Sequence, residues 1–138
     1  MKKIENDESI IDYYVCTNCF HKIRECNCMY YPISQLYYID LAIQEHVRIL
    51  NEKGYNTTAS CESHNPNGAI YIMFSRYDGI EGIELPEGFT GTQYGTAVEH
   101  IYNGKMSMED FEIEKKKYLD ILLEWCKSLP KRSENNTW

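Results

Sequence analysis

The sequence predicts an α+β fold in which a small antiparallel sheet packs with two main helices, plus an N-terminal zinc knuckle. Three observations predict this fold. Apolar residues recur at helical spacing in residues 40–53 and 107–129, short stretches that favour β-strands lie between them, and four cysteines crowd into residues 16–28. A chain of 138 residues has room for a single hydrophobic core.

The expected organisation has three parts. Residues 1–32 form an N-terminal segment with a four-cysteine zinc knuckle, residues 33–130 form the α+β domain, and residues 131–138 form a flexible polar tail. The segment from Ile33 to Ile39 is open to two interpretations, a strand or a lead-in to the first helix.

The cysteine spacing is the strongest chemical signal. Two close pairs can place four thiolates around one ion: Cys16, Cys19, Cys26 and Cys28. The expected compartment is a reducing one, in which disulfides are the poorer explanation. Four protein ligands close the coordination sphere, so a zinc ion here is expected to be structural and to fasten the N-terminal segment onto the domain. His21 lies in the same loop and could replace the sulfur of Cys28; a redox dithiol pair or a coincidence of spacing is the alternative to zinc.

The first helix is expected from Asp40 to Lys53. Asp40 is a candidate N-cap, and Gly54 stands where helices commonly end in a left-handed conformation. His46 lies beside the apolar face and is expected to pack there.

A β-hairpin is expected after this helix. Residues 55–61 and 69–74 favour strands, and residues 64–68 between them are rich in turn-forming asparagine, proline and glycine.

The last part of the domain combines a glycine-rich segment and a long helix. Residues 76–105 contain six of the eight glycines and fit short strands at Gly82–Leu85 and Ala97–Tyr102. The helix has Ser107 as its candidate N-cap and stops before Pro130. Its apolar stripe comprises Phe111, Tyr118, Leu119, Leu122, Cys126 and Leu129.

A second group of candidate site residues follows the first strand of the hairpin. We predict a ligand-binding site made of Cys61, Ser63, His64, Arg76 and Tyr77. Cys61 and His64 stand at a strand end and remain open to three interpretations: a structural or ligand-lining role, nucleophilic catalysis with the histidine as base, and a second metal. Arg76 can bind a phosphate and Tyr77 can stack on a base; the alternative is an exposed pair leaving a strand.

Charge and hydropathy exclude several classes of function. The formal net charge is −7 at pH 7 and no basic stripe is present, which disfavours general nucleic-acid binding. No apolar run approaches the about 18 residues that a membrane span needs, and no signal peptide is evident, so we expect a cytoplasmic protein without membrane contact. The 12 tyrosines suit half-exposed sheets and interfaces, and a homo-oligomer is expected.

Half of the chain resembles a group of small uncharacterised proteins of bacteriophages and Firmicutes. In that group a cysteine-rich head precedes a helix ending near LNxKGY, a strand ending in CxGH or CSGH, and a YIxF strand. The matching pieces here are the cysteine cluster, Leu50–Tyr55, Cys61–His64 and Tyr71–Phe74. Glu62 and Ser63 stand where the pattern has a small residue and a glycine. The resemblance covers residues 13–75 and implies no known activity; for a phage-encoded chain, the compartment is the host cytoplasm.

Three classes of function are compatible with these features. The first is a non-catalytic small-ligand-binding protein, and the resemblance makes its most concrete version a phage anti-defence protein that sequesters a nucleotide immune signal. The second is an enzyme that uses Cys61 and His64 on a nucleotide-like substrate. The third is a zinc-containing module that inhibits a host protein by docking through its head and tyrosine surface. Because few catalytic constellations are present, we expect binding rather than catalysis.

Overall fold

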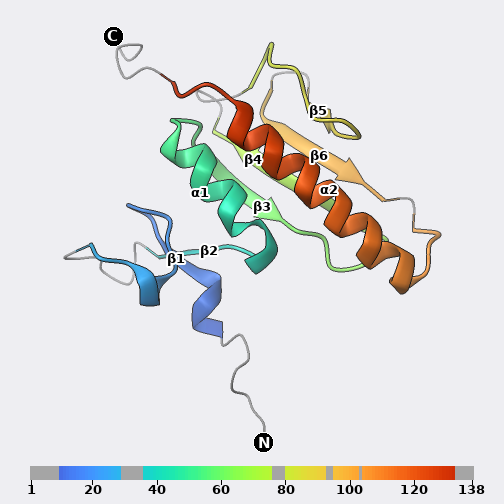
Figure 1. Ribbon diagram of the computed structural model, residues 1–138, viewed down its shortest axis with the longest axis horizontal. Coiled ribbons are helices and arrows are strands. Elements are labelled where there is room, and N and C mark those ends of the chain that lie inside the picture. Colours follow the sequence, from blue (N-terminus) through green and yellow to red (C-terminus); the bar gives the residue numbers. More distant parts are fainter. Residues whose placement is uncertain (1–9, 29–35, 76–79, 93–94, 103, 133–138) are drawn as a thin grey trace, which may run out of the picture.

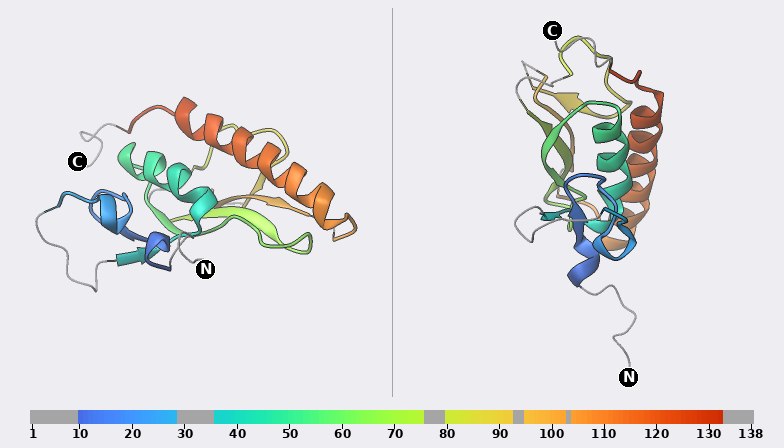
Figure 2. Two further views of the ribbon diagram at one scale, coloured as in Figure 1. Left: turned by 60° about the horizontal axis from the view of Figure 1, so that its bottom comes forward. Right: turned by 90° about the vertical axis from the view of Figure 1, so that its left-hand side faces the viewer.

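Two helices cover one face of a four-stranded antiparallel sheet, and a two-stranded hairpin lies beside the first helix (Figure 1). This computed structural model describes residues 10–28, 36–75, 80–92, 95–102 and 104–132. The elements, in chain order, are η1 (Ile10–Tyr13), β1 (Tyr14–Cys16), η2 (Ile23–Glu25), β2 (Leu36–Tyr38), η4 (Leu41–Ile43), α1 (Gln44–Glu52), β3 (Thr57–Cys61), β4 (Ala69–Phe74), β5 (Thr90–Gly91), β6 (Ala97–Ile101) and α2 (Met108–Ser128). Figure 2 shows both helices on the same side of the sheet. The predicted α+β class is confirmed.

The four-stranded sheet has the order β3-β4-β6-β5, and all neighbouring strands are antiparallel. Ile72 of β4 pairs with Ser60 on one side and with Val98 on the other. Alternate residues of β4 are buried, namely Ile70, Ile72 and Phe74. This alternation is expected for a sheet that packs one face against helices and leaves the other face open.

The first helix begins with a tight 3-10 turn. Asp40 stands at the N-cap position of η4, as predicted, but its side chain makes no capping hydrogen bond there. Gly54 follows the helix with a φ of 96°, a left-handed conformation that glycine adopts without strain. Together η4 and α1 occupy the place of the predicted helix.

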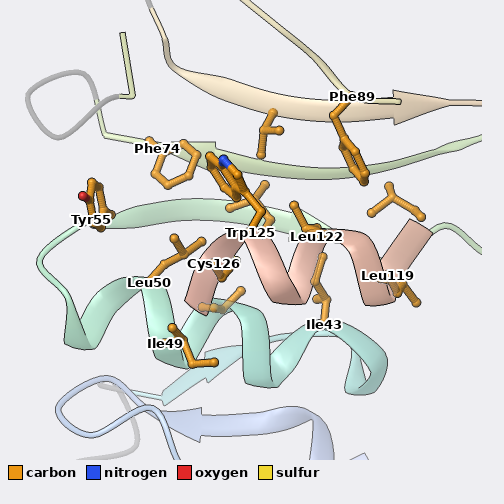
Figure 3. Packing of buried hydrophobic residues seen from close by; sticks show 14 of the residues in the cluster. Ile43, Ile49, Leu50, Tyr55, Phe74, Phe89, Leu119, Leu122, Trp125 and Cys126 are labelled. Carbon is orange, nitrogen blue, oxygen red and sulfur yellow. The ribbon is translucent and has the colours of Figure 1, made fainter. Parts of the chain in front are cut away.

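The second helix begins at its predicted N-cap. The hydroxyl of Ser107 accepts a hydrogen bond from the backbone N–H of Asp110 at 3.0 Å. Leu122 and Cys126 of this helix are fully buried and face Leu50 of α1 and the sheet (Figure 3). Burial of a leucine side chain contributes about 1.5–3 kcal/mol, so this layer contributes substantially to the stability of the fold.

A buried histidine joins the two helices. His46 is 4% exposed, and its Nε2 lies 2.8 Å from the carbonyl oxygen of Leu119. The expectation that His46 is a packed side chain is confirmed.

The prediction of a strand at Gly82–Leu85 is wrong. These residues form a turn and an irregular segment, in which Gly82 has a φ of 85°. The indole N–H of Trp125 donates to the carbonyl of Glu84 at 2.8 Å, so this segment is attached to α2 instead of joining the sheet. The edge strand is β5, two residues long, whereas the strand predicted at Ala97–Tyr102 is present as β6.

The segment from Ile33 to Ile39, for which the sequence allows either a strand or a lead-in to the first helix, contains a strand. Leu36–Tyr38 form β2 and pair with β1 in the register Tyr14 to Tyr38 and Cys16 to Leu36.

None of the helices within the described ranges is both long and apolar enough to cross a membrane.

Candidate metal centre

The four clustered cysteines belong to a small subdomain, called the head below, that consists of residues 10–28 and β2. The rings of Tyr13 and Tyr14 each lie 5.3 Å from the ring of Tyr38, and these contacts hold β1 against β2. Gln44 of α1 donates from its side chain to the carbonyl of Asp12 at 2.8 Å. The head is thereby placed beside the first helix.

Two tight turns direct the cysteine sulfurs toward one point. The backbone N–H of Asn18 donates to the sulfur of Cys16 at 3.3 Å, and the N–H of Cys28 donates to the sulfur of Cys26 at 3.2 Å. Phe20 closes the first turn with a φ of 61° and an N–H donated to the Cys16 carbonyl at 2.7 Å. The side-chain amide of Asn18 also donates to the sulfur of Cys28 at 3.2 Å. Amide donors of this kind stabilise thiolates and fix their direction.

The spacing of the sulfurs fits a tetrahedral ion. All four Sγ atoms lie within 4.8 Å of one another, and those of Cys16 and Cys28 are 3.8 Å apart. Four metal–sulfur bonds of about 2.3 Å define a tetrahedron with edges of about 3.8 Å. The four cysteines therefore form a site that can hold a metal ion.

Crowding gives these thiols very different pKa values. Burial disfavours the thiolate of Cys16, but the amides of Cys19 and Asn18 and the neighbouring thiols outweigh it and lower its pKa to about 7. At Cys26 the amide of Cys28 favours the thiolate, but desolvation and the other three sulfurs outweigh it and raise the pKa to about 12. Neighbouring thiolates repel one another. A divalent cation relieves this repulsion, because its charge neutralises several thiolates at once.

His21 is not one of the grouped donors. The cluster consists of the four sulfurs, Cys28 included, and the carbonyl of His21 accepts the N–H of Cys16 at 3.0 Å. The arrangement in which His21 replaces Cys28 is therefore not the one found here.

The described residues form at least three hollows beside the cysteine loop, and His21 lines each of them. One of about 180 Å³ lies between the head and α1 and is lined by Lys22 and Arg48 together with Glu25 and Glu45. A second of about 300 Å³ lies between the loop and Asn51, and a third of about 330 Å³ lies against the cysteines themselves.

A second cluster joins the end of β3 to the start of η4. Nε2 of His64 lies 3.1 Å from Oδ2 of Asp40, and the N–H of Glu62 donates to the same oxygen at 3.1 Å. The carboxylate of Glu62 in turn accepts the N–H of Ala42 at 2.8 Å and the ammonium group of Lys115 at 2.7 Å. Asp40 and Glu62 therefore clamp the strand end onto the helix start.

Cys61 and Ser63 complete this cluster. The sulfur of Cys61 lies within 4.8 Å of the donor atoms of Asp40 and His64 and accepts the N–H of Ser63 at 3.3 Å. Ser63 is buried with a φ of 74°, a conformation rare for a non-glycine residue, and this turn brings His64 back to Asp40. Burial raises the pKa of the Cys61 thiol, the Ser63 amide opposes this rise, and the carboxylate of Asp40 adds to it.

The structure thus brings three of the predicted ligand-binding residues together, Cys61, Ser63 and His64, and adds one that the sequence did not indicate. The sequence predicts Asp40 only as a helix cap, yet its carboxylate is the common partner of the imidazole and the thiol. In a nucleophilic cysteine–histidine pair the imidazole itself is the hydrogen-bond partner of the thiol, whereas here the partner of the His64 imidazole is Asp40. Arg76 and Tyr77 lie outside the described residues.

Comparison with known proteins finds no matching family model, no matching curated protein and no matching solved structure. The function therefore has to be argued from the residues of the two clusters.

Proposed function

We propose that this chain is a zinc-binding protein in which one ion, bound by the four clustered cysteines, holds the head on the α+β domain, and that its role is binding rather than catalysis. The observation that carries the proposal is the sulfur geometry: four thiols within 4.8 Å, two of them separated by a tetrahedral edge of 3.8 Å. A set of four sulfurs favours zinc or iron–sulfur chemistry over oxygen-preferring cations. Four protein ligands leave no position for a reacting water.

The head needs such an ion because it buries little apolar surface. Neither η1 nor η2 contributes a buried residue, and Val15 and Cys16 are the residues of β1 that are buried. A segment of this size does not form a stable core without a metal or disulfides, and all four cysteines are free. Structural zinc sites supply about 10–16 kcal/mol of binding free energy in small domains, which is ample for this purpose.

The metal content of the purified full-length protein tests the proposal. We expect one zinc ion per chain that resists a weak chelator, and its loss in Cys19→Ser. The matched control is Cys126→Ala, which removes a buried thiol of α2 that is not one of the clustered cysteines and should lower stability without lowering the content of this ion. A wild-type protein without a retained transition metal would contradict the proposal, and an iron-loaded protein would correct the identity of the metal.

The role that we propose for the metal-held head is to bind a small ligand. Two of the hollows beside it, about 300 and about 330 Å³, reach the lower end of the range usual for ligand sites. The first hollow, of about 180 Å³, is lined by the cations Lys22 and Arg48, by the carboxylates of Glu25 and Glu45, and by Phe20. Arg48 is ion-paired with Glu45 at 2.6 Å and with Glu52 at 2.9 Å, so contact with an anionic aromatic molecule such as a nucleotide would rest on Lys22 and the ring of Phe20. The more specific anti-defence role, sequestration of a nucleotide immune signal, rests on the phage resemblance and stays a prediction.

Native mass spectrometry of freshly purified protein tests the binding role. We expect a retained small molecule that is recovered intact after denaturation, and a loss of that molecule in Lys22→Ala. Recovery of a processed product would instead indicate an enzyme. Co-purification of a host protein with no small molecule would favour an interaction module.

A further inference from the structure

We infer that Asp40, Cys61 and His64 form a second transition-metal site, separate from the four-cysteine centre and open on its solvent side. Their donor atoms, a carboxylate oxygen, a sulfur and an imidazole nitrogen, lie within 4.8 Å of one another. Mixed oxygen, nitrogen and sulfur donors suit zinc and its neighbours in the first transition row, and the thiolate and imidazole make magnesium and calcium poor occupants.

The separation of the donor atoms is close to what ligation requires. Oδ2 of Asp40 and Nε2 of His64 are 3.1 Å apart. Tetrahedral bonds of about 2.1 Å to oxygen and nitrogen place these atoms about 3.4 Å apart, so the pair has to open by only about 0.3 Å. The imidazole can make this movement, because the side chain of His64 is 60% exposed.

The donors are held in place by groups that an ion would not displace. The side chain of Asp40 is only 11% exposed, and the N–H of Glu62 fixes its Oδ2. The N–H of Ser63 donates to the sulfur of Cys61, as second-layer amides do in metal sites. The cation Lys115 is neutralised by its ion pair with Glu62 at 2.7 Å, so it leaves the negative charge of the site available to a metal.

The site differs in kind from the four-cysteine centre. Three protein ligands leave one coordination position free, and the exposed imidazole places that position toward solvent. An ion held there can exchange water for an outside donor, such as a carboxylate, a phosphate or a thiolate, whereas the ion among the four cysteines has no position to exchange.

The test counts metal ions bound to the full-length protein and identifies their ligands. After saturation with Zn²⁺ and removal of excess, elemental analysis and native mass spectrometry should give two ions per wild-type chain and one per chain in both His64→Ala and Cys61→Ser. Loading with Co²⁺ should give thiolate-to-metal absorption from two spectroscopically distinct sites in the wild type, and only the spectrum of the four-cysteine centre in His64→Ala. His21→Ala is the matched histidine control and should retain the open site.

The outcomes separate this inference from the proposed function. Cys19→Ser should lose the ion of the four-cysteine centre and keep the ion at Asp40, Cys61 and His64. A single ion in the saturated wild type, or an equal metal content in wild type and His64→Ala, would overturn the inference and identify the cluster as a hydrogen-bonded clamp. Because the side chain of His64 is largely exposed, circular dichroism should show an unchanged fold in His64→Ala, and Cys61→Ser provides a second variant with the same expectation.

Discussion

The ammonium group of Lys53 donates to the carbonyl oxygen of Leu129 at 2.6 Å, across 76 residues of sequence. The same group contacts the carbonyls of Cys126 at 2.9 Å and Lys127 at 2.5 Å. Lys53 stands at the C-cap of α1, and these three oxygens lie at the C-terminal end of α2. One cation thus satisfies the unpaired carbonyls of α2 and opposes the negative end of its dipole.

Replacement of Lys53 by methionine should therefore destabilise the protein. Methionine keeps the length of the side chain but cannot donate, so three carbonyls lose their charged partner. Hydrogen bonds to charged groups contribute about 1.5–3 kcal/mol, and we expect a loss in this range in the free energy of unfolding, measured with urea. Lys116→Met is the control, because this side chain is 79% exposed and should cost less than about 0.5 kcal/mol. Equal losses in the two variants would show that the cap contributes nothing.

The stability of the protein should respond differently to loss of the hydroxyl group at two buried tyrosines. The hydroxyl of Tyr55 donates to the carbonyl of Pro130 at 2.6 Å, so Tyr55→Phe should cost about 1 kcal/mol. The hydroxyl of Tyr102 is buried and has no hydrogen-bond partner within the described part of the chain, and burial raises the pKa of this residue to about 12. Tyr102→Phe should therefore leave the stability unchanged or increase it. Thermal unfolding of the two variants checks the order, and a larger loss in Tyr102→Phe would contradict it.

Stability should fall in mild acid because of His46. Burial lowers the pKa of this imidazole below its usual value of 6.5, although its bond to the Leu119 carbonyl opposes the shift. Its other ring nitrogen, Nδ1, is buried without a partner in the described structure, so a proton there would be unpaired. Because the pKa of His46 is lower in the folded state, the unfolded chain binds more protons than the folded protein below pH 6.5. The contribution of His46 to stability is therefore fully present above pH 6.5 and is lost as the pH falls toward the folded-state pKa.

The variant His46→Gln isolates this contribution. Glutamine can still donate to the Leu119 carbonyl but does not titrate, so its stability should decline less than that of the wild type between pH 7 and about pH 5. Chemical unfolding at several pH values measures both curves. Because acid also protonates the zinc-binding cysteines in both proteins, only the difference between the curves reports on His46, and parallel curves would refute the assignment.

The parts of the fold predicted from the sequence are those that depend on local signals. The cysteine pairs lie close along the chain, so their spacing alone indicates a common site. Ser107 caps its own helix three residues away, and Gly54 supplies its own left-handed conformation. In each case the residues that interact are neighbours in sequence.

The parts that were missed depend on contacts between distant segments. Asp40 meets the N–H of Glu62 across 22 residues, and no local pattern distinguishes this role from that of a helix cap. The strand predicted at Gly82–Leu85 fails because the indole of Trp125, which is 41 residues from Glu84, fixes that residue's carbonyl. The strand β5 has only two residues, too few for an alternating pattern to reveal.

X-ray absorption spectroscopy of the zinc-loaded double variant Cys61→Ser/His64→Ala tests the central claim most directly, because it removes the open site and leaves the ion in the head to be measured alone. Our account predicts a first shell of four sulfur atoms at about 2.3 Å. A shell that contains nitrogen or oxygen, or a protein that binds no ion, would contradict it.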